Sequence, residues 1–167
     1  MKLAIYDMDR TITRRPSWLP WLLFHARREA PWRLLLLPLA AVPSAGFILG
    51  LVDRRRLKEL THLLLIGRCT EREQLDRTAA AFADWFGPRA ELAGALARIA
   101  ADRADGWEIA IATASSACYA RHLAARWGVT HLVATENPTD GRFIFPRIRR
   151  DNCYGAAQLA MVRDFVG

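Results

Sequence analysis

The second half of the chain alternates between strand-like and helix-like segments, and this order limits the fold more than any other feature of the sequence. Apolar runs at residues 107–112 and 131–135 predict strands, and the Ala-rich stretch 116–127 between them predicts a helix. Another helix is expected over residues 89–104, and the Asp-Gly pair at 140–141 predicts a hairpin turn. Strands that alternate with helices form a parallel sheet, so the expected fold class is α/β.

The first strand of this sheet is separated from the others by a long helical stretch. Residues 3–6 form a short apolar run that ends at a polar turn, which predicts a buried strand. Residues 16–88 are rich in Trp, Leu, Ala and Arg at helical spacing. The expected organisation is an α/β core built from residues 1–15 and 89–167, with an all-helical insert at 16–88. A last helix is expected to begin near residue 154.

Composition and charge exclude several classes of protein. With 167 residues, 52% of them apolar and 25% charged, the chain is expected to form about one globular domain and not a disordered or fibrous protein. Its net charge of +7 comes from 24 basic residues, of which only Lys2 and Lys58 are lysines. The arginines occur in short clusters between apolar runs and form no recognisable nucleic-acid motif, so nucleic acid is not an expected partner.

Features of the amino terminus and the cysteines indicate a cytoplasmic location. The short apolar run after Lys2 meets Asp7 and Asp9 at once, which leaves no room for the apolar region of a signal peptide. The three cysteines contain no CxxC pair, which indicates a reducing compartment and no zinc site.

One stretch of the insert, residues 34–52, contains 19 residues and no charge. A straight helix of that length would measure about 28 Å, just enough to span the hydrocarbon core of a bilayer. Pro38 and Pro43 interrupt it, so two short helices are expected. Three placements stay open: packing within the insert, peripheral contact with a membrane, or a true crossing. The arginine clusters on either side, at 27–28 and 54–56, suit contact with the inner face of a membrane.

Two aspartates, Asp7 and Asp9, follow the first predicted strand directly. Ligands of open α/β sheets bind at the carboxyl ends of the strands. Two carboxylates this close raise each other's pKa unless a cation lies between them, and their oxygens suit Mg²⁺. Taken alone, the same pattern also fits an aspartate that caps a helix and is followed by a turn.

Three segments in order resemble the haloacid dehalogenase superfamily: Asp-Met-Asp-Arg-Thr at 7–11, Ile-Ala-Thr-Ala-Ser at 111–115, and Asn-Cys-Tyr-Gly at 152–155. The helical insert between the first two is similar to the cap of the phosphoserine-phosphatase-like branch. The order of apolar run and basic clusters is similar to that of the phosphatidylglycerophosphate phosphatases. The resemblance extends over essentially the whole chain and implies a Rossmann-like parallel sheet with a helical cap.

The resemblance implies roles for individual residues. Asp7 would be the nucleophile that forms an aspartyl-phosphate, and Asp9 would be the general acid and then the general base. Mg²⁺ would be the cofactor, held by the Asp7 carboxylate and the backbone carbonyl of Asp9. The implied phosphate ligands lie in three motifs: Thr11, Thr113, Ser115 and Gln158.

The sequence departs from the family pattern in two places. The third motif supplies a lysine in the family, but Gln158 stands at that position and carries no charge. Lys2 and Lys58 are not expected to replace it, because they lie in the first strand and in the insert. The acidic fourth motif of the family would lie beyond the third, so the chain resembles a phosphatase that lacks its C-terminal strands. The first strand is then expected to form an exposed edge at which the protein could associate.

These observations predict a Mg²⁺-dependent phosphomonoester hydrolase, impaired in this form, that acts on a phosphorylated small molecule or lipid. The apolar, arginine-flanked insert favours a lipid or other amphiphilic phosphate, and a soluble ester such as phosphoserine is the rival. The alternative is a protein that keeps the fold and binds phosphate or a membrane without catalysis.

Overall fold

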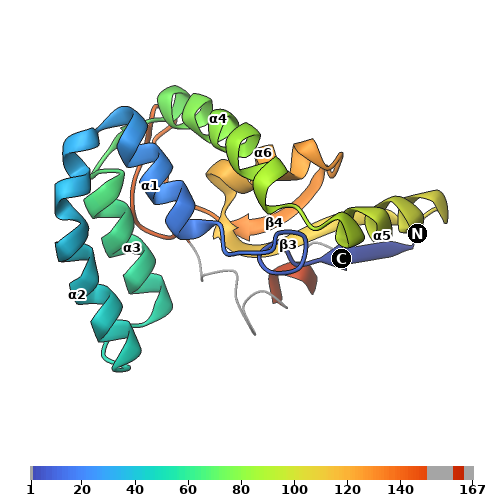
Figure 1. Ribbon diagram of the computed structural model, residues 1–167, viewed down its shortest axis with the longest axis horizontal. Helices are drawn as coiled ribbons and strands as arrows, with labels where there is room; N and C mark the ends of the chain where they lie inside the picture. The colour runs from blue at the N-terminus through green and yellow to red at the C-terminus, as the bar shows by residue number, and fades with distance from the viewer. Residues whose placement is uncertain (1, 150–159, 164–167) are drawn as a thin grey trace.

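The computed structural model describes residues 2–149 and 160–163, which form an α/β core and a group of helices beside it (Figure 1). The helix and strand bounds in chain order are β1 Leu3–Tyr6, α1 Trp18–Glu29, the 3₁₀ helix η1 Pro31–Leu36, α2 Leu37–Ile48, α3 Arg54–Leu65, β2 Thr70–Glu71, α4 Arg72–Ala90, α5 Ala93–Ala104, β3 Glu108–Ser116, α6 Ala117–Arg126, β4 His131–Thr135 and β5 Phe143–Ile144. The expected helix near residue 154 begins outside the described residues.

A parallel three-stranded sheet in the order β1-β3-β4 forms the centre of the core. This confirms the predicted α/β class. Leu3 pairs with Glu108 and Ala110 pairs with His131, so all three strands end at the same edge of the sheet. Among the described strands β1 pairs only with β3, and Ile5 on it is 41% exposed.

Strand β3 is longer than the sequence indicated. The expected strand ended at residue 112, but β3 continues to Ser116, which pairs with Thr135 after a shift of register. Thr113 and Ser115 therefore lie on the central strand, whose polar carboxyl end is buried. Polar residues at this end hid the continuation of the strand from a prediction based on apolar runs.

Two other local predictions are corrected by backbone contacts. The helix expected from residue 89 starts at Ala93, because the Leu92 amide donates to the Ile12 carbonyl and separates α4 from α5. The turn at 140–141 exists, with Gly141 at a φ of 100°, but strand β5 pairs with β2, far away in the sequence. The hairpin itself is reduced to one bridge between Thr139 and Ile144.

Helices α1, α2 and α3, with η1, form the cap and lie side by side at the left of Figure 1. Helix α4 contacts both α1 of the cap and α6 of the core, and it runs without a break past residue 88. Its contacts are aromatic: the ring of Phe82 lies 5.4 Å from the rings of both Trp21 and Tyr119. All three side chains are completely buried, so one continuous core joins α1 to the sheet domain.

The uncharged stretch of the insert forms η1 and α2, and Pro38 lies in the first turn of α2. Pro43 lies inside α2 without ending it. Residues Pro31–Ile48 form a helical run that is long and apolar enough to cross a membrane, but only 6% of it is buried. The stretch packs against α3, but most of its side chains are not covered by the insert; within α2 only Ala40 and Pro43 are buried.

Candidate active site

A tight turn after β1 places both aspartates at the carboxyl edge of the sheet. The amides of Ile12 and Thr13 both donate to the carbonyl of Met8, at 3.0 and 2.9 Å. Arg10 closes the turn with a φ of 65°, a conformation that residues other than glycine adopt rarely. The turn faces a hollow of about 400 Å³ lined by Asp7, Asp9, Arg10, Pro16, Arg54, Thr113 and Ala114. Strands β1 and β3 are neighbours, which is why their ends meet here.

Asp7 is positioned to act through its carboxylate. Its Oδ1 accepts a hydrogen bond of 2.8 Å from the Met8 amide. Burial raises the pKa of Asp7 above its usual value and the nearby charge of Asp9 raises it further, while the Met8 amide acts in the opposite direction. A cation in the hollow would stabilise the ionised carboxylate, which is the form that can attack phosphorus or bind a metal.

Asp9 is held by two donors from different parts of the fold. The amide of Ser17, just before α1, donates to its Oδ1 at 3.0 Å, and the hydroxyl of Ser115 donates to its Oδ2 at 2.7 Å. The Ser17 hydroxyl lies 3.0 Å from both the Ser115 hydroxyl and the Tyr119 phenol oxygen. Burial raises the pKa of Tyr119 well above its usual value, and the charge of Asp9 adds to this effect. Tyr119 therefore stays neutral and can hydrogen-bond within this network.

The residues expected to bind phosphate are placed differently relative to the hollow. Thr113 is fully buried and lines the hollow, and its hydroxyl accepts a 3.1 Å hydrogen bond from the Ser115 amide. A hydroxyl that accepts one hydrogen bond can still donate another, here to a ligand. Ser115 does not line the hollow; its hydroxyl contacts Asp9. Thr11 is exposed in the turn and is not among the lining residues, and Gln158 lies outside the described part of the chain.

Two basic residues of the cap, Arg54 and Lys58, reach the site. Arg54 lines the hollow, and the Lys58 ammonium donates to the carbonyl of Ala114, between Thr113 and Ser115. Lys58 therefore reaches the carboxyl edge of the sheet although it belongs to the insert, a placement that its position in the sequence did not indicate. Positions 54 and 58 share one face of α3, and helix packing brings that face onto the edge of the sheet.

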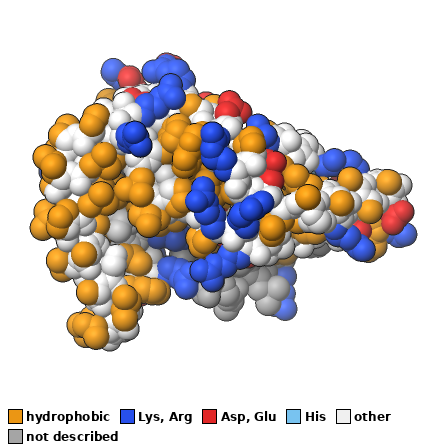
Figure 2. All heavy atoms as spheres, viewed as in Figure 1, with side chains coloured by type: hydrophobic (Ala, Val, Ile, Leu, Met, Phe, Trp, Pro, Cys, Tyr) orange, Lys and Arg blue, Asp and Glu red, His pale blue; other side chains and the backbone are white. Residues whose placement is uncertain are grey.

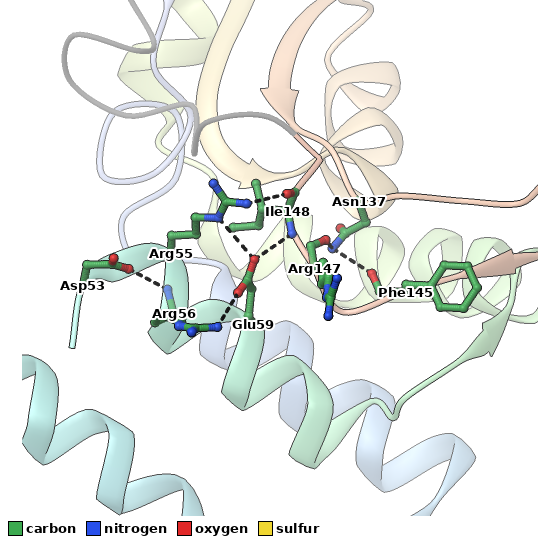
Figure 3. Close-up of polar contacts among 8 residues, drawn as sticks. All are labelled: Asp53, Arg55, Arg56, Glu59, Asn137, Phe145, Arg147 and Ile148. Carbon is green, nitrogen blue, oxygen red and sulfur yellow. Dashed lines mark hydrogen bonds and ion pairs between the residues drawn. The ribbon is translucent and has the colours of Figure 1, made fainter.

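Polar contacts fix α3 against the segment that follows β4 (Figure 3). The carboxylate of Glu59 accepts a 3.0 Å hydrogen bond from the Ile148 amide, and the Arg55 guanidinium donates to the Ile148 carbonyl at 3.0 Å. Arg55 and Glu59 also pair with each other at 3.2 Å. Asn137 fixes the other side of the segment by donating to the carbonyls of Phe145 and Arg147. These contacts explain how a cap helix comes to lie over the carboxyl edge of the sheet.

The oxygen atoms at this edge fit part of a Mg²⁺ site. Asp7 can offer its carboxylate and Asp9 its backbone carbonyl, and both are the hard ligands that Mg²⁺ prefers. Within residues 2–149 and 160–163, no group of three or more His, Cys, Asp or Glu side chains gathers in a way that could hold a metal.

The sequence profile of the haloacid dehalogenase-like hydrolases matches residues 4–166. No curated protein matches the chain. Among solved structures, a protein of unknown function from Bordetella pertussis Tohama I is similar with a TM-score of 0.84 and 21% identity, over 98% of this chain and 73% of that one.

Two further structures share the fold. A HAD family hydrolase from Salmonella enterica serovar Typhi has a TM-score of 0.66 and 16% identity, over 97% of this chain and 50% of that one. A phosphoserine phosphohydrolase-like protein from Francisella tularensis has a TM-score of 0.62 and 17% identity, over 100% of this chain and 74% of that one. Because the profile match extends over nearly the full sequence, the chain belongs to the haloacid dehalogenase-like hydrolases.

Proposed function

We propose that the protein hydrolyses phosphomonoesters through a covalent intermediate on Asp7. The observation that carries this proposal is that Asp7, Asp9 and Thr113 line one hollow at the carboxyl edge of the sheet. An Asp7 carboxylate oxygen attacks phosphorus, and the bond between phosphorus and the ester oxygen breaks. Asp9 gives its proton to the leaving oxygen. In the second step Asp9 takes a proton from water, the water oxygen attacks phosphorus, and inorganic phosphate leaves as the Asp7 carboxylate is restored.

Several groups of this chain would stabilise the charge on the transferring phosphoryl group. The Thr113 hydroxyl and the Arg54 guanidinium lie in the wall of the hollow and supply a hydrogen bond and a positive charge. Ser17 and Ser115 hold the Asp9 carboxylate in one orientation, which favours proton transfer along a fixed direction. When bound by Asp7 and Asp9, Mg²⁺ would neutralise further negative charge on the phosphoryl oxygens.

The cap favours an amphiphilic phosphate, such as a lipid phosphate, over an amino-acid phosphate. The one charged cap residue among those that line the hollow in the described structure is Arg54, a cation. An amino-acid ester would bring an ammonium group, and the lining from the cap offers no carboxylate to pair with it. The part of the cap just before Arg54, formed by η1 and α2, is rich in leucine and carries no charge between residues 34 and 52.

Phosphate release from an aryl phosphate in the presence of Mg²⁺ tests the proposal. We expect turnover by the wild-type protein, none by Asp7→Asn, and normal turnover by Asp140→Asn, which removes a carboxylate from the exposed turn near β5. Equal background in the wild-type and Asp7→Asn proteins would contradict catalysis by this form. If vanadate still bound in that case, the protein would be a phosphate-binding member of the family without turnover.

A further inference from the structure

The cap exposes a large apolar surface on η1, α2 and the turn that follows α2. We call it the cap apolar face, and six aliphatic side chains that are 54% to 82% exposed define it: Leu35, Leu39, Val42, Ile48, Leu49 and Leu51. Figure 2 shows hydrophobic side chains gathered over the end of the molecule that the cap helices occupy. Soluble monomers rarely expose this many large aliphatic side chains on one short segment, so they indicate a binding surface.

The charged residues that border the face are mostly basic, and Glu59 on α3 is paired with Arg55 and Arg56. Between Glu29 and Asp53 the sequence has no acidic residue, and basic clusters border the stretch at 27–28 and 54–56. Two of the basic groups lie directly beside apolar rings of the stretch. The Arg54 guanidinium lies 5.8 Å from the centre of the Phe47 ring, and that of Arg33 lies 4.6 Å from the centre of the Trp32 ring. An apolar centre with a cationic border is complementary to a bilayer that carries anionic headgroups.

The geometry points to a helix that lies on a membrane and does not cross it. Although Pro31–Ile48 is long enough to cross, it is divided into a 3₁₀ helix and an α-helix, and α2 packs along α3. Helix α3 begins with three consecutive arginines, which could not follow α2 into hydrocarbon at low cost. A shallow position lets the leucines enter the acyl region while the arginines stay at the level of the phosphates.

We propose that the cap apolar face docks on the surface of an anionic lipid bilayer. A second copy of the chain is the less suitable occupant, because a symmetric contact would bring two sets of arginines together on a protein of net charge +7. The docking itself depends only on the surface of the cap. Its functional meaning rests on the proposed phosphatase activity.

One residue connects this surface to the hollow. Arg54 lines the hollow beside Asp7 and also lies beside Phe47 of α2. A bilayer against the cap would therefore place lipid headgroups near the opening to Asp7. The substrate class that fits this arrangement is a phosphomonoester whose apolar part remains in the membrane while its phosphate enters the hollow.

Vesicle flotation tests the docking. We expect the protein to float with vesicles of equal parts phosphatidylcholine and phosphatidylglycerol, and to stay unbound with phosphatidylcholine alone. The double variant Leu35→Ser, Ile48→Ser should lower the partition coefficient about 100-fold, since each aliphatic side chain moved out of water contributes about tenfold or more. Trp107→Ser removes a half-exposed apolar side chain just before β3 and should bind like the wild type.

Two results would overturn the proposal: no binding of the wild-type protein to the anionic vesicles, or equal binding by the double variant. Circular dichroism on each variant verifies that it is folded, as expected for changes at exposed positions. Sedimentation that shows a dimer abolished by the same double variant would identify a second copy as the occupant instead. Asp7→Asn should float normally although it lacks turnover, so failure of docking and failure of catalysis are distinguishable.

Discussion

Two histidines buried in the cap should make the protein sensitive to mild acid. His25 on α1 and His62 on α3 are 2% and 1% exposed. Both ring nitrogens of each are buried without a hydrogen-bond partner among the described residues. Burial lowers the pKa of His25 to about 4 and that of His62 to about 3, from an ordinary value of 6.5, and the charge of His25 lowers the pKa of His62 further.

These pKa shifts determine how the free energy of unfolding changes with pH. A base with a lowered pKa in the folded state binds fewer protons there than in the unfolded chain, so its stability contribution is complete above about pH 6.5 and falls as the pH drops. Between pH 7 and pH 5 each histidine should cost about 2 kcal/mol, and the two together about 4 kcal/mol. That is a large share of the stability of a domain of this size.

Urea unfolding at pH 7 and pH 5 measures the loss directly. The wild-type free energy of unfolding should fall by about 4 kcal/mol, and that of the double variant His25→Leu, His62→Leu should be nearly constant apart from groups that both proteins share, such as Asp7. Each single variant should keep about half of the wild-type loss. If the wild-type protein and the double variant lose stability equally between the two pH values, the histidines are not the cause and the reasoning is wrong.

Three further predictions concern the site and the core. Ser115→Ala should lower kcat for an aryl phosphate about tenfold with little change in KM, because Asp9 loses its 2.7 Å hydrogen bond; a change confined to KM would contradict this role. Lys58→Met removes the contact with the Ala114 carbonyl and should lower kcat/KM about tenfold, with Lys58→Arg as the conservative comparison; unchanged kinetics in Lys58→Met would show that the contact does not support the site. Phe82→Ala should lower the free energy of unfolding by about 3 to 5 kcal/mol in urea titrations, because the ring is fully buried between cap and core; a loss below about 1 kcal/mol would refute that packing.

The features that local pattern controls were predictable from the sequence. Apolar runs predicted β1 and β4, and the aspartates just after β1 had to lie at the carboxyl edge of a parallel sheet. Thr113 lines the same hollow as Asp7 because β1 and β3 are neighbours. The strand and turn predictions depend on the order of residues along a single segment, which tertiary packing does not alter.

The features that depend on packing between distant segments were not predictable. Ser17 resembles an ordinary helix cap in the sequence, but its hydroxyl contacts Ser115 and Tyr119, far away along the chain. Lys58 reaches Ala114 because α3 is fixed by Arg55 and Glu59 to the segment after β4. No spacing within the insert indicates which face of α3 will meet the sheet.

Helix α4 holds α1 of the cap against the core. Packing therefore does not divide the protein where the sequence divides into core and insert. Its 19 residues form a helix about 28 Å long. Fully buried aromatic rings pack α1 against one side of this helix and α6 against the other. Swinging α1 away from the sheet would open that aromatic contact, and α3 is joined to the same buried cluster through Leu65 and to the segment after β4 through polar contacts. Because Ser17, just before α1, holds the Asp9 carboxylate, the aromatic packing that fixes α1 also fixes the orientation of the proton donor beside the hollow.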